Sequence, residues 1–278
     1  EIKIIMENPS STFKSRETVE LETEFFENGF VIREVENKDT LDKLRNLIIE
    51  ASYNYLGKSK PKSLQRYLDE IGPDLKSIQL NDLRLNILEK MQNTPWLKAA
   101  YYSLARKMLA TLVGNELAMQ KSINLSIQVP GDDSSLLPVH ADVLNGASPF
   151  EVVLWIPLVD CYATKSMYIL NPKKNSKILS NLKDFSENTS EELFKTIKDD
   201  VSWLTVPYGS YLIFTQNLLH GNRVNKETQT RWSMNCRFKS LLSPYSDKKF
   251  GEFFEPITIR AATRLGMKFQ TPDMFDEV

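Results

Sequence analysis

The hydrophobic pattern of residues 1–113 predicts a mostly helical segment. Alternating apolar positions after an Asn-Gly turn predict one short strand, and leucine and isoleucine repeats with the helical period predict three helices. The predicted elements are a strand over residues 30–35 and helices over residues 39–57, 81–91 and 95–113. Asp39 or Thr40 is expected to cap the first of these helices, and Gly57 to end it.

After Gly114 the pattern changes to short runs of valine, isoleucine, tryptophan and tyrosine separated by turn residues, which is typical of antiparallel β structure. The predicted strands cover residues 116–129, 139–143, 151–159, 166–170, 201–206, 211–215 and 231–241. This number is close to the eight strands of a jelly roll. The chain contains no Gly/Ser linker, so we expect a single domain.

The expected domain spans residues 1–278 and has three parts: a helical part at about 1–113, a β core at about 114–245, and a polar insertion at about 171–200. Residues 171–200 are interpreted as an insertion into the β core or as a lid. It contains one predicted helix over residues 190–197, entered through Thr189 or Ser190.

Composition excludes several classes of partner. The 278 residues include 35 basic and 36 acidic side chains, so the net charge of −1 offers no field for nucleic acid or an anionic membrane. The apolar runs are too short to cross a bilayer, and residues 1–15 show no signal peptide. Cys161 and Cys236 lack metal-site or redox spacing and are expected to be buried thiols. We therefore expect a cytoplasmic, soluble protein that acts on a small molecule.

Both histidines of the chain fall in a pattern typical of a metal site. In the predicted strand over residues 139–143, His140 and Asp142 would project from one face. His220 follows the predicted strand over residues 211–215 and could supply a third ligand. Two histidines and one carboxylate leave coordination positions open, which suits non-haem Fe(II) holding a co-substrate and dioxygen.

A second group of polar residues lies on the last predicted strand. Arg231 and Ser233 share a face of it, and a guanidinium beside a hydroxyl is suited to bidentate binding of a carboxylate. Arg237 continues the same row, so it could bind an acidic substrate. Lys165 and Arg223 could add positive charge, although the solvated state is the favoured interpretation for both.

Two interpretations are open for the remaining candidate site residues. Asn124, Ser126 and Gln128 form a polar row on the strand that leads to His140, and they either contact a ligand or face solvent. Trp155 is interpreted as a core residue more readily than as a platform for substrate.

The ligand pattern, with an H-x-D, a distal histidine and an R-x-S eleven residues later, resembles the Fe(II)/2-oxoglutarate-dependent oxygenase superfamily. Three further segments, FFENGFVIREVE, VPYGSYLIF and HGNRVN, are similar to its phytanoyl-CoA dioxygenase-like branch. The stretch GASPFEVVLWIPLVDCYATKSMYIL is most similar to oxygenases of bacterial carbohydrate gene clusters. The chain departs from the branch at Ser210, where an aspartate is usual, and at residues 170–172.

The resemblance implies an α+β, mainly β fold: a double-stranded β-helix, or cupin-like jelly roll, buttressed by N-terminal helices. It implies that Fe(II) is held by His140, Asp142 and His220. It also implies that 2-oxoglutarate is held by Arg231 and Ser233, with Asn124 and Gln128 as further candidates, and that O2 is the second co-substrate. Arg237 and Trp155 are candidate substrate contacts.

The expected reaction is hydroxylation of a small molecule, with a sugar or sugar-derived metabolite as the leading candidate. The presence of Asp142 favours hydroxylation over halogenation. Two alternatives stay open: a cupin-like, metal-dependent sugar isomerase or epimerase, and a non-catalytic jelly-roll carbohydrate-binding protein.

Overall fold

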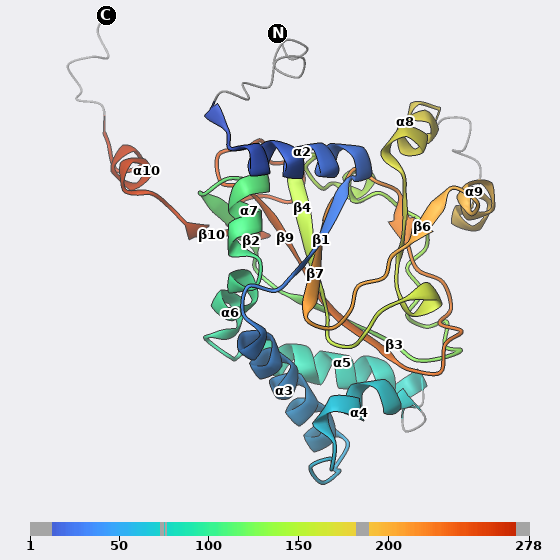
Figure 1. The fold of residues 1–278 in the computed structure, drawn as a ribbon. Coiled ribbons are helices and arrows are strands. Elements are labelled where there is room, and N and C mark those ends of the chain that lie inside the picture. The colour runs from blue at the N-terminus through green and yellow to red at the C-terminus, as the bar shows by residue number, and fades with distance from the viewer. Residues whose placement is uncertain (1–12, 73–74, 76, 182–188, 271–278) are drawn as a thin grey trace, which may run out of the picture.

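The structure is a computed structural model that describes residues 13–72, 75, 77–181 and 189–270. Residues 1–12, within the segment tested for a signal peptide, and residues 182–188, within the predicted insertion, lie outside the described residues. Helices lie at both ends of an antiparallel β core, and α10 extends away from the body of the protein (Figure 1).

The first half of the chain is helical, as predicted, and contributes one strand. The helices are α2 (Arg16–Asn28), α3 (Lys38–Tyr55), α4 (Leu64–Glu70), α5 (Ser77–Gln92), α6 (Leu97–Ser103) and α7 (Arg106–Leu112). The cap of α3 is Asn37, whose side chain accepts from the Thr40 backbone N–H at 2.8 Å, so the predicted cap at Asp39 or Thr40 is wrong. The single helix predicted over 95–113 is two helices, because Ala105 leaves the helical region at φ −140°.

The larger sheet is antiparallel and has seven strands in the order β1-β7-β4-β9-β2-β10, with β3 also paired to β9. Its strands are β1 (Phe30–Glu34), β2 (Leu117–Gln120), β3 (Asn124–Gln128), β4 (Glu151–Pro157), β7 (Ser210–Thr215), β9 (Arg231–Ser240) and β10 (Phe254–Thr258). The sheet thus includes β1 and β10, which lie outside the predicted core range of about 114–245. The sequence pattern did not predict β10.

The smaller sheet has three strands in the order β6-β5-β8: β5 (Tyr168–Leu170), β6 (Val201–Trp203) and β8 (His220–Gly221). The chain between β5 and β6 contains α8 (Pro172–Ser180), which was not predicted, and α9 (Ser190–Ile197), which was. α9 begins with a complete capping box formed by Thr189 and Glu192. After the last strands, α10 (Ala261–Gly266) is the final helix of the described residues.

The strand predicted over residues 116–129 is in fact two strands that pair with different parts of β9. β2 pairs with residues 238–240, and β3 pairs with residues 231–235. The chain bends between them, where the Lys121 backbone N–H donates to the Phe253 carbonyl at 2.9 Å. An apolar pattern without a Gly or Pro does not reveal such a bend, because it depends on the partner strand.

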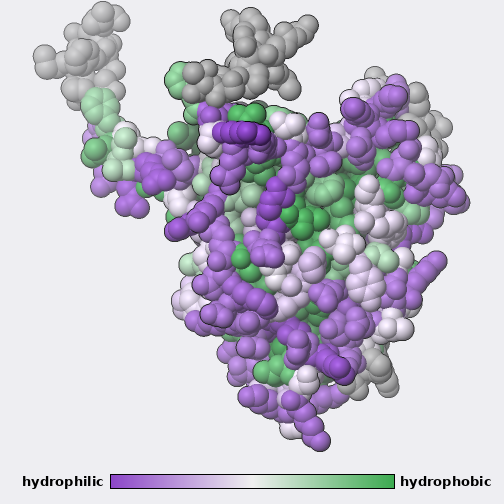
Figure 2. Space-filling model, viewed as in Figure 1, coloured by the Kyte–Doolittle hydropathy of each residue, from purple (hydrophilic) through white to green (hydrophobic). Residues whose placement is uncertain are grey.

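The helices and the larger sheet share one apolar core. It joins Leu44 and Ile48 of α3, Leu83 of α5, Ile213 of β7 and Trp232 of β9, all with no exposed surface. Helix α3 contacts α5 and α6, and α5 contacts β3, so the helical part packs against the larger sheet through α5. Cys161 and Cys236 are buried free thiols, as predicted. Hydrophilic side chains dominate the viewed face, and hydrophobic ones gather near its centre (Figure 2).

Among the described residues, none of the helices has the length and the apolar composition needed to cross a membrane.

Candidate metal centre

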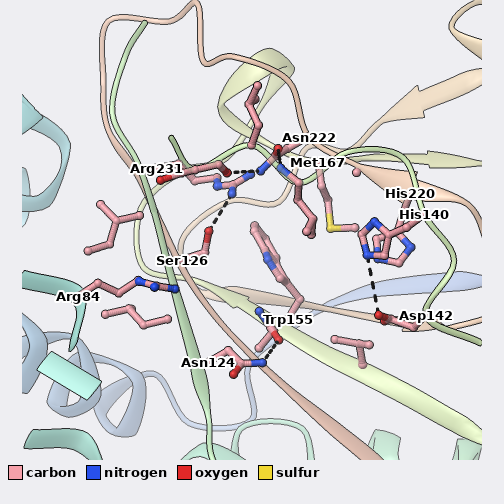
Figure 3. A pocket seen from close by; sticks show the side chains of 18 of the residues that line it. Arg84, Asn124, Ser126, His140, Asp142, Trp155, Met167, His220, Asn222 and Arg231 are labelled. Atoms are coloured by element: carbon pink, nitrogen blue, oxygen red, sulfur yellow. Dashed lines mark hydrogen bonds and ion pairs between the residues drawn. The ribbon is translucent and has the colours of Figure 1, made fainter. Parts of the chain in front are cut away.

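A pocket of about 530 Å³ lies between the smaller sheet, β3, β9 and α5. His140, Asp142 and His220 lie together on one side of the pocket, and Arg231, Ser126 and Arg84 lie on the other (Figure 3). Other lining residues include Asn124, Trp155, Met167, Asn222, Asn235 and Arg237. The structure therefore brings both predicted groups, the histidine cluster and the arginine of the last predicted strand, into one cavity.

The two histidines are held side by side by the backbone. The His140 N–H donates to the His220 carbonyl at 3.0 Å, and the His220 N–H donates to the His140 carbonyl at 2.9 Å. The Nδ1 of His140 lies 2.7 Å from the Pro138 carbonyl, and that of His220 lies 2.8 Å from the Leu218 carbonyl. A carbonyl oxygen only accepts, so each Nδ1 carries a proton, and in the neutral imidazole the lone pair is then on Nε2, which faces the cluster.

Asp142 completes the cluster. Its Oδ1 lies 3.8 Å from the His140 Nε2, and one ligand atom from each of the three residues lies within 4.8 Å of the other two. The prediction that His140 and Asp142 share a strand face is wrong: His140 forms an isolated bridge and Asp142 begins a 3-10 turn over Asp142–Asn145. Gly146 ends the turn at φ 78°, a conformation that side chains other than glycine rarely adopt.

The charges around the cluster favour deprotonated ligands. Burial and, to a smaller extent, the neighbouring His140 lower the pKa of the His220 imidazole to about 4. Burial also acts to raise the pKa of the Asp142 carboxyl, but Arg237 and the two histidines outweigh it and the net shift is downward. Neutral imidazole and ionised carboxylate are the forms that bind metal.

We expect the free energy of unfolding of the metal-free protein to fall as the pH is lowered from 6.5 to about 4. In this window the unfolded chain protonates His220 and the folded chain does not, so folding is opposed by up to about 1.4 kcal/mol per pH unit. Urea unfolding of wild type and His220→Gln at several pH values measures the effect. The free energy of unfolding of wild type relative to that of His220→Gln should fall as the pH falls. A relative stability that does not change with pH would contradict the expectation.

A chain of polar side chains extends from Asp142 away from the cavity. Arg237 donates from Nη2 to the Asp142 Oδ1 at 2.9 Å and from Nε to the Gln216 Oε1 at 3.3 Å. Gln216 in turn donates to the Glu151 Oε2 at 2.8 Å. Glu151, Gln216 and Asp142 are buried. Arg237 was predicted as a candidate substrate contact; it lines the pocket, but its guanidinium donates to the Asp142 carboxylate.

Arg237→Met is expected to weaken metal binding by about 10- to 100-fold, because loss of a group that orients a ligand has costs of that size. Arg237→Lys should keep part of the affinity, since it keeps the charge but not the fork. Titration of the metal-free protein with Zn(II) measures the change. Equal Zn(II) affinity in wild type and Arg237→Met would show that Asp142 is positioned without it.

Arg231 is buried on the opposite side of the pocket. Its Nη1 donates to the Ser166 carbonyl at 3.1 Å and its Nη2 to the Ser126 hydroxyl at 2.9 Å, while its Nε has no partner. Burial lowers the pKa of its guanidinium from the usual value. The hydroxyl of Ser233, two residues along β9, is also buried without a partner. Unpaired buried donors beside a cavity are costly to the free protein and are suited to a ligand with acceptor oxygens.

The other predicted site residues are divided between the pocket and its surroundings. Asn124 and Trp155 line the pocket, and Asn124 donates to the Asn235 Oδ1 at 3.0 Å. Gln128 does not line the cavity, and its amide donates to the Arg223 carbonyl. Ser233 faces the same side of β9 as Arg231. Unlike Arg231, it does not line the cavity.

The sequence suggested two further cations near the site, Lys165 and Arg223, and neither lines the pocket. Lys165 is fully buried and donates to the Asp69 carboxylate at 2.6 Å and to Gln229 at 2.9 Å. Arg223 is paired with the Glu191 carboxylate by two hydrogen bonds. The favoured solvated state is therefore wrong for Lys165, because the half-buried Asp69 carboxylate compensates its desolvation.

The sequence pattern missed Arg84, Met167, Asn222 and the Gln216–Glu151 pair. The Asn222 Oδ1 accepts from the Leu137 N–H at 2.7 Å and so holds the loop that lines the pocket beside His140. A signal for Asn222 existed, since it follows His220 by two residues. For Arg84 no local signal existed. It lies in a helix whose apolar spacing predicted only that one face of the helix is buried.

No protein-family model matches the chain, and no curated protein matches it. Solved structures are similar to it over most of their length. The non-heme monooxygenase ThoJ in complex with nickel superposes with a TM-score of 0.55 at 14% identity, covering 87% of this chain and 85% of that chain. The carbocyclase SnoK from nogalamycin biosynthesis, described as non-heme and alpha-ketoglutarate-dependent, gives 0.51 at 14%, covering 89% and 98%.

HygX from Streptomyces hygroscopicus, with nickel and 2-oxoglutarate bound, gives a TM-score of 0.50 at 12% identity, covering 84% of this chain and 89% of that chain. At these identities the similarities establish the fold. The prediction of an α+β double-stranded β-helix with N-terminal helices is confirmed.

Proposed function

We propose that this protein is a non-haem Fe(II)- and 2-oxoglutarate-dependent dioxygenase that hydroxylates a C–H bond of a small molecule and releases succinate and CO2. One observation carries the proposal: two imidazoles and a carboxylate, with ligand atoms within 4.8 Å of one another, share a cavity with a buried arginine that keeps an unpaired donor. The solved structures with this fold that hold metal or 2-oxoglutarate support it.

The residues fit a divalent metal. His140 and His220 offer Nε2 lone pairs because their Nδ1 atoms face carbonyls, and Asp142 offers a carboxylate oxygen. Two histidines and one carboxylate form the donor set of non-haem Fe(II) oxygenases, in which the remaining coordination positions stay open. Iron bound there would supply the activation of dioxygen that is coupled to decarboxylation of the co-substrate.

The residues also fit a dicarboxylate. Arg231 presents a charged fork whose Nε is unpaired, and Ser233 adds a hydroxyl on the same face of β9. Charge-assisted hydrogen bonds from these groups would hold the carboxylate that is remote from the metal and orient the co-substrate across the cavity. A metal-dependent isomerase or epimerase would not need this arginine, so the arrangement favours the oxygenase.

Within the superfamily, we place the chain in the phytanoyl-CoA dioxygenase-like branch, on the segments of the sequence that resemble it, as a single domain over residues 1–278. A sugar or sugar-derived metabolite is the proposed substrate. Amide and hydroxyl side chains that suit a polyhydroxylated ligand line the pocket, and Trp155 adds an aromatic face. These polar residues are Asn124, Ser134, Ser135, Asn222 and Asn235.

Anaerobic addition of Fe(II) and 2-oxoglutarate to the protein tests the proposal. We expect a weak visible charge-transfer band that requires both additions, and succinate formation when air is admitted. If Fe(II) binds but 2-oxoglutarate gives no band and no succinate, the isomerase or epimerase becomes the better assignment. If no metal binds, the non-catalytic binding protein does.

A further inference from the structure

The side of the pocket away from the metal carries a cation that the proposed chemistry does not use. Arg84 lies on α5 and points into the cavity beside Ser126 and Trp155 (Figure 3). Its Nη2 donates to the Asn81 Oδ1 at 2.6 Å. Within the described parts of the chain, its guanidinium makes no ion pair with a carboxylate.

Helix α5 brings this cation to the cavity by its position in the fold. Leu80, Asn81 and Arg84 all line the pocket, and residues three or four apart lie on the same helix face. Four apolar residues of α5 are buried and fix the helix in the core beside β3: Leu80, Leu83, Ile87 and Met91. The pocket-facing guanidinium is thus presented by a packed element, and Asn81 limits its orientation.

The other charges of the cavity are already matched. Arg237 pairs with Asp142, the one carboxylate among the described residues that line the pocket. Of the two carboxylates of 2-oxoglutarate, one would bind Fe(II) and the other is assigned to Arg231. After these pairings Arg84 is left without a counter-ion. Its side chain is half-buried and lines the cavity, so an anionic group bound there could reach the guanidinium.

We propose that Arg84 binds an anionic group of the substrate, so that the substrate is an acidic small molecule carrying a carboxylate or a phosphate. This inference rests on the proposed function for the identity of the site. The anionic group would lie against α5, and the C–H bond to be oxidised would face His140, Asp142 and His220. The planar fork of an arginine is suited to either oxyanion.

The experiment uses inorganic sulfate as the probe, on the full-length protein with Zn(II) and saturating 2-oxoglutarate at constant ionic strength. The chain has four tryptophans, so few indole N–H signals appear in a proton–nitrogen correlation spectrum. Trp155, which lines the same pocket, is assigned by its loss in Trp155→Phe. We expect sulfate to shift this signal saturably, which gives a dissociation constant.

Arg84→Gln should raise that dissociation constant about tenfold or more, because a charge-assisted hydrogen bond is lost. Arg84→Lys should retain most of the affinity. Arg66→Gln, at an exposed arginine of α4 outside the pocket, is the matched control and should leave it unchanged. The proposal is overturned if sulfate causes no saturable shift, if Arg84→Gln binds sulfate like wild type, or if Arg66→Gln loses affinity equally.

A separate measurement distinguishes this inference from the proposed function. The Fe(II) charge-transfer band gives the 2-oxoglutarate affinity of wild type and Arg84→Gln, which should agree. A tenfold loss in the variant would assign Arg84 to the co-substrate and overturn the inference. Absence of the band in wild type would remove the proposed function, whereas the sulfate titration, which needs neither iron nor turnover, would still decide whether Arg84 forms an anion site.

Discussion

Asp142→Ala is expected to reduce the affinity for Fe(II) by more than about 100-fold, since loss of even an outer partner of a ligand has effects of up to about that size. The charge-transfer band with 2-oxoglutarate and the release of succinate should disappear with the metal. Asp142 supplies the one negative charge among the three ligands, so its loss removes more than a donor atom. Anaerobic Fe(II) titration followed by absorbance measures the change.

The control separates loss of a ligand from loss of the fold. Removing Asp142 leaves the Arg237 guanidinium without its carboxylate, so some loss of stability is expected as well. Thermal unfolding of the metal-free proteins shows how large it is. Asp39→Asn changes an acidic residue in the first turn of α3, away from the pocket, and should behave like wild type in Fe(II) binding. A band of undiminished strength in folded Asp142→Ala would exclude Asp142 as a ligand.

Arg231→Met is expected to weaken 2-oxoglutarate binding by about 10- to 100-fold while Fe(II) remains bound, because hydrogen bonds to a charged group contribute about 1.5–3 kcal/mol. The methionine fills much of the same volume in a site where Arg231 is only 4% exposed. Titration of the Fe(II)-loaded variant with 2-oxoglutarate gives the affinity, and Zn(II) binding shows that the metal site is intact.

Two comparisons make this result specific. Arg231→Lys keeps a charge without the fork and should bind 2-oxoglutarate more tightly than Arg231→Met but less tightly than wild type. Ser233→Ala removes the neighbouring unpaired hydroxyl and should have a smaller effect of the same kind. If Arg231→Met, folded and metal-binding, keeps the wild-type affinity, the co-substrate is held elsewhere in the pocket.

The metal-site pattern could be read from the sequence because the chain has so few histidines. With two of them, the H-x-D at His140 and the distal His220 had few competing assignments, and the structure places all three side chains together. The strand that carries Arg231 was also predictable, since apolar side chains occupy every second position from Trp232 to Phe238. The prediction of how His140 and Asp142 come together was wrong, because a bridge and a 3-10 turn replace the strand.

The residue types of the candidate site could be predicted from the chain alone: the donor atoms, the arginine and serine of β9, and the alternation that places those two on one face. The groups that meet them became visible only in the folded protein. Arg84, Gln216 and Glu151 reach the pocket or its ligands through helix packing and strand pairing between segments far apart in the chain. Local periodicity shows that a helix such as α5 buries one face, but it carries no information about what that face covers, since burial by packing is non-directional.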